Sequence, residues 1–153
     1  QSKVLKKADS VANEGVVESY IHAGGKVGVL LELNTETDFV ARTDDFKSLA
    51  KEIALHIAAS NPLYVNISDV PTEVIEKEKE IYKEQAKDSG KPDAVVEKMI
   101  EGKLAKYYEE TCLMEQTFVK DPEKKIKDLL SDSVAKLGEN IVVRRFTRYH
   151  LGN

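Results

Sequence analysis

The segment Val16–Asn34, with the sequence VVESYIHAGGKVGVLLELN, carries the clearest structural signal in the chain. Before its paired glycines, two sets of side chains alternate, namely Val17, Ser19 and Ile21 with Glu18, Tyr20 and His22. After the glycines, the alternation continues through Val27, Val29, Leu31 and Leu33. A period of two is typical of β-strands, and Gly24 and Gly25 can supply the positive φ of a tight hairpin turn. The segment therefore predicts a β-hairpin.

A helix is predicted downstream of the hairpin, over residues 44–60. Its apolar side chains recur at helical spacing: Phe46, Leu49, Ile53, Ala54, Ile57 and Ala58. Asp44 and Asp45 suit the positive end of the helix dipole, and Asn61-Pro62 ends the helix.

Two charged helices are predicted over about residues 71–111. The first runs from Pro71 to about Lys87, and the second places one stripe of side chains at Val96, Ile100, Leu104, Tyr107 and Thr111. Between them, Ser89-Gly90-Lys91-Pro92 has the glycine and proline that end one helix and begin the next. Helices with so short a connection lie antiparallel. Because the pair is densely charged, we expect it to be solvated and to project from the body of the protein.

A last helix and a third strand complete the predicted fold. After a break at TFVKDPEKK, the helix carries Ile126, Leu129, Leu130, Val134 and Leu137, and Gly138 ends it. The C-terminal segment NIVVRRFTRYHL predicts a strand that pairs with the early hairpin. The fold class is therefore α+β, a three-stranded antiparallel sheet with helices packed on it and a protruding antiparallel helical hairpin.

The composition argues against several classes of protein. The chain has 153 residues and a formal net charge of −4, whereas a general binder of nucleic acid or anionic membranes needs a basic surface. Cys112 is the single cysteine, so no intramolecular disulfide can form, which is compatible with a reducing compartment. No apolar run approaches the roughly 20 residues that span a bilayer. Since the sequence begins at Gln1, we expect a fragment or a processed form.

No group of reactive side chains indicates an enzyme active site. The three histidines are far apart in the sequence: His22, His56 and His150. None has metal-ligand spacing with Cys112 or with another histidine. His56 falls at a core-facing helix position, whereas His22 lies near the exposed hairpin tip and is a candidate contact residue. The segment AGGKV lacks the first glycine and the final Ser or Thr of a phosphate loop.

A small basic cluster lies in the C-terminal strand, at Arg144, Arg145 and Arg148. We expect it to cover a sheet edge or to meet acidic side chains, and contact with RNA is the less favoured interpretation.

The connection between the hairpin and the first helix contains an unexpected aromatic residue. Thr37-Asp38-Phe39-Val40 places phenylalanine and valine where a polar loop is expected. In one interpretation, Asp38 caps a short helical turn and Phe39 packs beneath the hairpin. In the other, Phe39 is a wedge that faces a partner, since aromatic residues among polar ones often anchor protein interfaces. Residue types alone favour the first interpretation.

Several segments follow one another in a recognisable order from about Val11 onward. They are EGVVESYIHAGGKVGVLLELNTETDFVAR, AKEIALHIAASNPLYV, VIEKEKEIYKEQA, SGKP, EKMIEGKLAKYYEE and LGENIVVRRFTRY. This series resembles the core of the translation elongation factor Ts family, whose signature includes a TDFVA segment after a YIH…GVL…N hairpin.

The resemblance implies a guanine nucleotide exchange factor for elongation factor Tu that is not an enzyme and needs no cofactor. In the family, the Asp-Phe pair of this segment enters the GTPase domain of the partner near its Mg²⁺ site. The corresponding residues are Asp38 and Phe39, with Thr37 and Val40 in support.

The resemblance also implies a contact with the third domain of elongation factor Tu. His22 of the hairpin motif would make it, together with the segment Gln116–Pro122 through Phe118 and Val119. Thr117 stands where the family usually has proline, and Thr35 stands where it often has cysteine.

The domain organisation that the resemblance implies is that of the short, single-core form. Residues 14–153 correspond to one core domain, with the helical hairpin at about 71–111, and residues 1–13 to a remnant of the connecting helix. The N-terminal UBA-like domain of the family does not appear in the sequence. Because that domain also contacts the GTPase domain, we expect weaker exchange from this chain alone.

Assembly and location follow from the same resemblance. We expect a homodimer formed through sheet surfaces, with two partner molecules, and no direct contact with nucleic acid or a membrane. The expected location is the bacterial cytoplasm, or the interior of an organelle in a eukaryote. The alternative is a non-catalytic structural or adaptor protein that docks through its helical hairpin and keeps Phe39 in its core.

Overall fold

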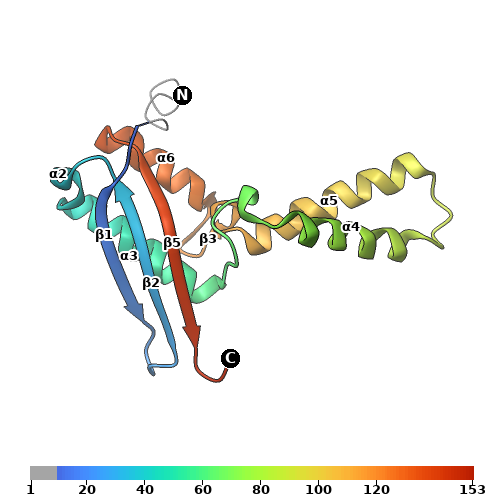
Figure 1. Ribbon diagram of the computed structural model, residues 1–153, viewed down its shortest axis with the longest axis horizontal. Helices are drawn as coiled ribbons and strands as arrows, with labels where there is room; N and C mark the ends of the chain where they lie inside the picture. Colours follow the sequence, from blue (N-terminus) through green and yellow to red (C-terminus); the bar gives the residue numbers. More distant parts are fainter. Residues whose placement is uncertain (1–9) are drawn as a thin grey trace. The chain divides into compact units, whose positions relative to one another are not determined.

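Three antiparallel strands form the main sheet of the computed structural model, which describes residues 10–153 (Figure 1). The expected connecting-helix remnant falls mostly on residues 1–9, which lie outside the described residues. The chain divides into two compact units. We call them the sheet unit, which consists of the chain up to Asn61 and of Thr117–Asn153, and the helix-pair unit, Pro62–Gln116.

The elements confirm the predicted α+β class. In chain order they are β1 (Glu14–Ile21), β2 (Val27–Thr35), α2 (Asp38–Ala41), α3 (Asp44–Ser60), η1 (Ile67–Asp69), α4 (Thr72–Ala86), α5 (Asp93–Thr111), η2 (Leu113–Glu115), β3 (Thr117–Phe118), β4 (Asp121–Lys125), α6 (Ile126–Leu137) and β5 (Ile141–His150).

Strand β2 is the centre of the sheet, with β1 on one side and β5 on the other. The predicted hairpin of β1 and β2 is confirmed, and Gly24 and Gly25 adopt φ values of 98° and 71° in its turn. Strand β5 pairs antiparallel with β2, as expected, with a bulge between Glu32 and Leu33. The bulge changes the register near the end of β2 that leads into α2.

The core of the sheet unit lies between the sheet and α3. Val29, Leu31 and Leu33 project to the same face of β2, and all three are buried. Helix α3 packs on β1 and β2 and buries one stripe of side chains: Phe46, Leu49, Ala50, Ile53, Ala54, Ile57 and Ala58. These are the apolar positions that the helical periodicity indicated. The other face of the sheet has no such cover among the described elements of this unit.

The ends of α3 explain why this helix has the length that the sequence predicted. The Thr43 hydroxyl accepts a hydrogen bond from the Phe46 N–H at 3.2 Å, which caps the first turn. At the other end, Asn61 adopts a left-handed conformation with φ 49° and donates its N–H to Ile57 O. Proline follows at position 62 and cannot continue the helix.

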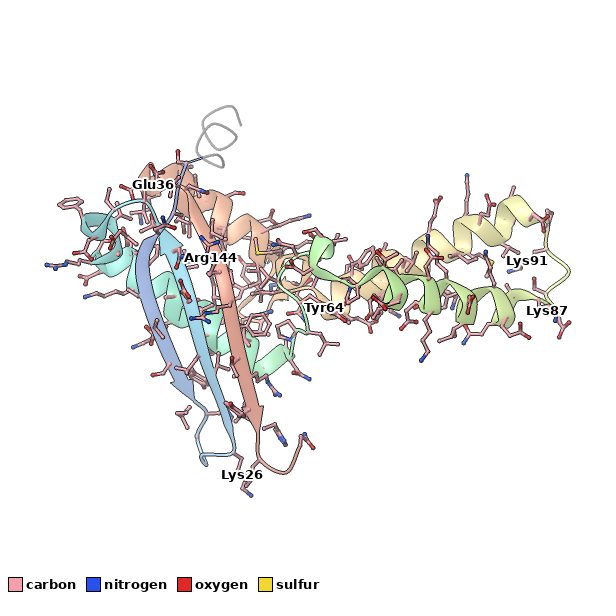
Figure 2. The ribbon with its side chains drawn as sticks, viewed as in Figure 1. Lys26, Glu36, Tyr64, Lys87, Lys91 and Arg144 are labelled. Carbon is pink, nitrogen blue, oxygen red and sulfur yellow. The ribbon has the colours of Figure 1, made fainter. Side chains whose placement is uncertain are left out.

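Each arginine of β5 has a polar partner within the sheet unit, although Arg144 and Arg145 are exposed. Arg145 pairs with Glu32 across the sheet at 3.0 Å, which agrees with the expected acidic partner. Arg144, labelled in Figure 2, donates to Ala12 O. Arg148 donates to Ala58 O at 2.9 Å and so ties β5 to the end of α3.

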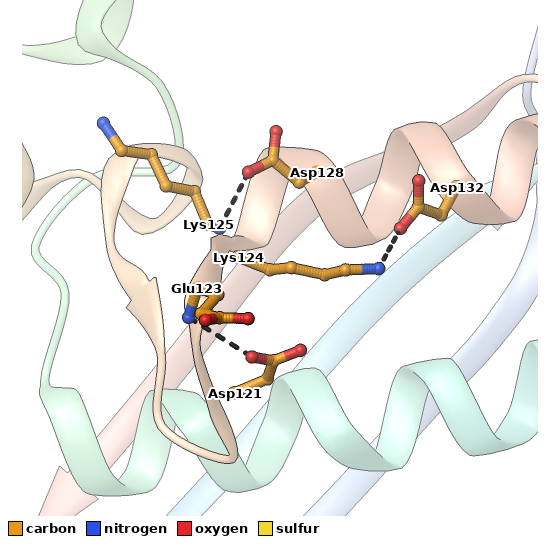
Figure 3. A network of polar contacts seen from close by, with 6 residues as sticks. All are labelled: Asp121, Glu123, Lys124, Lys125, Asp128 and Asp132. Atoms are coloured by element: carbon orange, nitrogen blue, oxygen red, sulfur yellow. Dashed lines mark hydrogen bonds and ion pairs between the residues drawn. The ribbon is translucent and has the colours of Figure 1, made fainter.

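The expected break at residues 117–125 contains structure that the sequence did not predict. Strands β3 and β4 form a small antiparallel pair that leads directly into α6. Figure 3 shows how that helix begins: the Lys125 N–H donates to Asp128 at 2.9 Å, and Lys124 pairs with Asp132 at 2.6 Å. Hydrogen bonding to Asp132 raises the pKa of Lys124.

The helix-pair unit contains the two predicted charged helices, α4 and α5, which contact each other along their lengths (Figure 1). No residue of α4 is buried, and α5 buries only Ile100 and Leu104. The Lys103 ammonium lies 5.5 Å from the centre of the Tyr82 ring, a cation–π contact between the helices. Lys87 and Lys91, labelled in Figure 2, lie in the connection between the helices. The projection of the pair from the body remains a prediction.

Candidate functional site

The connection from β2 to α3 is a fixed turn that contains the short helix α2. The Thr37 hydroxyl accepts the Val40 N–H at 3.2 Å and so is the cap of α2. Asp38 is the first residue inside the helix, so the expectation that Asp38 provides the cap was wrong by one position. At its other end, the Thr43 hydroxyl donates to Val40 O at 2.7 Å, which joins α2 to the cap of α3.

Phe39 points into solvent from this turn. Its side chain is 82% exposed, whereas its neighbours Val40 and Ala41 are buried. Consecutive residues of a helical turn point about 100° apart, so burial of these neighbours directs Phe39 outward. The interpretation in which Phe39 packs beneath the hairpin is therefore wrong for this structure. An exposed aromatic side chain on an ordered turn contributes little to the stability of its own fold, and such side chains often mark interaction surfaces.

Glu139, which follows α6 in the chain, binds the base of the turn. Its Oε1 accepts the Thr37 N–H at 3.0 Å, and its Oε2 accepts the Thr37 hydroxyl at 2.7 Å. The buried Thr35 hydroxyl lies 3.0 Å from Oε1. In return, Glu36, labelled in Figure 2, accepts the Asn140 N–H at 2.6 Å. Two connections that are about a hundred residues apart in the chain thus exchange hydrogen bonds in both directions.

The environment of Glu139 favours its charged form. Partial burial opposes ionisation, but hydrogen bonds from Thr37 and Thr35 and from the Glu36 N–H outweigh it and lower the pKa of this carboxyl. A carboxylate that accepts several hydrogen bonds is an ionised group at neutral pH. No local sequence pattern pointed to Glu139, since its partners belong to a different part of the chain.

Asp38 is held only loosely. Its carboxylate pairs with the Arg42 guanidinium at 2.7 Å, and both side chains are more than half exposed. Exposed pairs of this kind contribute about 0–1 kcal/mol. Asp38 can therefore exchange Arg42 for another partner at low cost.

His22 lies at the opposite end of the hairpin from α2. It is exposed, and its Nδ1 lies 3.0 Å from the Tyr20 hydroxyl. A strand rises about 3.3 Å per residue, so the nine residues of β2 separate the hairpin tip from the turn by roughly 30 Å. His22 and Phe39 therefore belong to two separate surfaces of the sheet unit.

The segment expected to contact the same partner domain as His22 divides into a buried and an exposed residue. Phe118 is 5% exposed and lies against the His56 ring, at 6.0 Å between ring centres. The Val119 N–H donates to His56 Nδ1 at 3.2 Å, whereas the Val119 side chain is exposed. Phe118 thus anchors the segment, and its side chain is not available at the surface as the expectation required. Val119 is available.

The uncovered face of the sheet carries a group of exposed apolar side chains. Strand register places them on one face, because Val17 pairs with Glu32, Ile21 with Gly28 and Leu30 with Thr147. The exposed members are Val17, Ile21, Leu30 and Tyr149. We call this surface the open face. It spans all three strands, from one edge of the sheet to the other.

Residues 10–153 present few groups suited to bond-making chemistry. His56 is fully buried, and burial raises the pKa of the Cys112 thiol, although a hydrogen bond with Thr111 opposes the effect. Within the same residues, no three His, Cys, Asp or Glu side chains lie together as metal ligands. None of the described helices is long and apolar enough to cross a membrane.

Comparison with known proteins gives a consistent result. A family model described as elongation factor TS matches residues 3–153. Elongation factor Ts of Thermoanaerobacter sp. (strain X514) is 58% identical over 147 residues, which cover 96% of this chain and 72% of that protein. The protein of the same name from Syntrophomonas wolfei is 57% identical over 151 residues, 99% of this chain and 71% of its own. The one from Carboxydothermus hydrogenoformans is 60% identical over 147 residues, with 96% and 68% covered.

Truncation of Phe39 should leave folding nearly unaffected. Since its ring is exposed, Phe39→Ala should change the free energy of unfolding by less than about 1 kcal/mol. The matched control is Phe46→Ala, which removes a fully buried ring of the same type and should cost about 3–5 kcal/mol. Denaturant unfolding of both variants measures the difference. Equal destabilisation by the two would show that Phe39 is part of the core.

The hydrogen bonds of Glu139 should make stability depend on pH in the acid range. The folded-state pKa lies below the ordinary value of 4.5, so the contribution of the carboxylate is present above that value. It should disappear as pH falls through the folded-state pKa. We expect parent and Glu139→Gln to differ in unfolding free energy at pH 7 and to converge in acid. A difference that grows as pH falls would contradict the assignment.

Proposed function

The chain belongs to the elongation factor Ts family, and on that premise we propose that it is a guanine nucleotide exchange factor that binds elongation factor Tu and promotes GDP release during translation elongation. The observation that supports this most is the exposed Phe39, held on a turn whose backbone is capped at both ends. The function needs binding energy but no covalent chemistry and no cofactor, so we propose that the chain is not an enzyme.

The proposed mechanism is insertion of Asp38 and Phe39 into the GTPase domain of the partner. Bound GDP is held by contacts to its phosphates and by Mg²⁺, which neutralises phosphate charge. A side chain that displaces the element beside the metal weakens both sets of contacts together. Phe39 is suited to this role because it offers a large apolar group that is 82% exposed in the free chain. Asp38 is suited because its present partner, Arg42, is exposed.

Exchange then follows from thermodynamic linkage. If the factor lowers the affinity of its partner for nucleotide, nucleotide lowers the affinity for the factor by the same ratio. Incoming GTP can therefore expel the factor, and the cycle requires no further energy source. A very tight complex would be a disadvantage, which agrees with a small contact element such as α2.

A second contact is proposed at the hairpin tip and the β3–β4 segment, through His22 and Val119. The hairpin tip lies roughly 30 Å from Phe39 along β2, so one small domain could not easily cover both sites. The family resemblance implies the third domain of elongation factor Tu for this second contact and its GTPase domain for the first, and the separation of the two sites agrees with two different domains.

The open face is the proposed surface of a homodimer. Its exposed apolar side chains, including Leu30 and Tyr149, would be shielded from water by the same face of a second copy. A twofold interface is self-complementary, so one surface can serve both subunits. Each subunit would then present its own Phe39 to a separate partner molecule.

The proposed location is the compartment in which translation takes place, either the bacterial cytoplasm or the interior of an organelle. The relatives quoted above come from bacteria, which supports the first. We propose no direct binding to nucleic acid, because the net charge is −4 and the arginines of β5 already have partners.

Exchange activity should depend on Phe39. We expect the parent chain to accelerate release of fluorescent GDP from elongation factor Tu and Phe39→Ala to reduce the acceleration about tenfold, equivalent to a loss of 1.4 kcal/mol of coupling. Asp38→Ala should act in the same direction but more weakly. Val95→Ala, an exposed apolar truncation in α5, is the control and should have no effect.

The same assay separates exchange from the adaptor alternative. If elongation factor Tu binds the chain but its GDP release is unchanged, the exchange function is wrong. If Val95→Ala abolishes binding while Phe39→Ala does not, docking through the helix pair is the better interpretation.

The dimer should be detectable by mass. At tens of micromolar, roughly the range in which interfaces of modest affinity are occupied, light scattering should give twice the 17.1 kDa of one chain. Leu30→Lys places a charge on the open face and should shift the mass to that of a monomer. Val95→Lys, outside this face, should not. A monomer mass for the parent chain would refute the dimer.

A further inference from the structure

The turn that carries Phe39 is too short to define its own position. Helix α2 has four residues, and helices of this length are not stable by themselves in water. Three interactions hold the turn in its conformation. They are the burial of Val40 and Ala41, the hydrogen bond from the cap residue of α3, and the contact with the carboxylate of Glu139. Of these, only Glu139 lies outside the segment that joins β2 to α3.

Glu139 is connected to helix α2 through two successive hydrogen bonds, both of which involve the Thr37 hydroxyl. The Thr37 hydroxyl donates its hydrogen to Glu139 Oε2 and, with a lone pair, accepts the Val40 N–H. The carboxylate therefore orients the hydroxyl that caps α2. The other carboxylate oxygen, Oε1, accepts a hydrogen bond from the Thr37 N–H and lies 3.0 Å from the Thr35 hydroxyl. These contacts fix the orientation of the Glu139 carboxylate.

The backbone conformation before Glu139 directs its side chain toward the turn that contains α2. Gly138 ends α6 with φ 77°, a left-handed conformation that favours glycine. The chain reverses there, and Glu139 comes immediately before the buried residues Asn140 and Ile141 at the start of β5. The return bond from the Asn140 N–H to Glu36 holds the two connections together at a second point.

We propose that Glu139 is a positioning residue for nucleotide exchange: through Thr37 it fixes the orientation of α2, so that Phe39 reaches its partner already ordered. This inference rests on the exchange function proposed above. A contact residue that is ordered before binding loses less conformational freedom on association. Glu139 itself touches no partner in this scheme, and all of its effect passes through the turn.

A local probe can test the positioning without any partner. The chain contains no tryptophan, so Phe39→Trp introduces a single indole at the tip of the turn. In that background, Glu139→Ala should lower the fluorescence anisotropy of the indole, while circular dichroism at the same temperature still reports a folded protein. The matched control is Asp132→Ala, which removes an acidic partner of Lys124 elsewhere in the sheet unit and should leave the anisotropy unchanged. Equal anisotropy in the Phe39→Trp chain with and without Glu139→Ala overturns the proposal.

The exchange assay tests whether the positioning matters for function. Glu139→Ala should raise the concentration of factor needed for half-maximal stimulation of GDP release about tenfold, and Glu139→Gln should raise it less, because its carboxamide oxygen can still accept one of the two hydrogen bonds from Thr37. When Phe39 has already been truncated, adding Glu139→Ala should cause no further loss. An equal, additional loss in that background would show that Glu139 acts by another route and would overturn the proposal.

The two measurements also separate this proposal from the one on which it rests. If the parent chain fails to stimulate GDP release, the exchange function is wrong, and the anisotropy still decides whether Glu139 orders the turn. If the parent stimulates release and the anisotropy does not respond to Glu139→Ala, the exchange function stands and the positioning role is wrong.

Discussion

The packing of β2 against α3 is the constraint on which the rest of the sheet unit depends. Strand β2 pairs on both sides, and its inward side chains Val29, Leu31 and Leu33 are buried. Helix α3 contributes the matching apolar stripe, so the relative position of these two elements is set by burial rather than by local preference. The connection between them then has little freedom. The connection buries Val40 and Ala41 in the core, and Phe39 therefore faces solvent.

This arrangement separates the residues that stabilise the fold from those proposed for recognition. The helix-covered face of the sheet contains the side chains that hold the unit together, whereas Phe39, His22 and the open face lie outside that core. An aromatic ring that is mostly exposed in its own chain can enter another protein without greatly weakening the fold that presents it. The same separation means that a truncation at Phe39 tests recognition, and a truncation at Phe46 tests stability.

The polar contacts of the sheet unit are of two kinds. Glu139 with Thr37, His56 with Val119 and Arg148 with Ala58 each join parts of the chain that are distant in sequence. The last two are partly buried, whereas the contact of Glu139 with Thr37 is exposed. Partly buried hydrogen bonds such as these two are costly to break. The pairs of Asp38 with Arg42 and of Lys124 with Asp132 are exposed and local, and contribute little. Contacts of the first kind fix the positions of elements, and those of the second kind can be exchanged for a partner.

The amino-acid sequence by itself determined the elements that depend on local pattern. Alternation in β1 and β2, the helical spacing in α3 and the glycines of the hairpin turn are properties of neighbouring residues, so they could be recognised without a structure. The tertiary structure decided whether individual side chains are exposed. Residue types alone favoured a packed Phe39, the family resemblance favoured a partner-facing one, and the structure exposes it. Phe118 was expected to contact a partner, yet its side chain is buried, because exposure depends on residues far away in the chain. The role of Glu139 could not be predicted from neighbouring residues, since it depends on a contact with Thr37, about a hundred residues away in the sequence. Burial and long-range hydrogen bonding are properties of the assembled fold, and only the fold could reveal them.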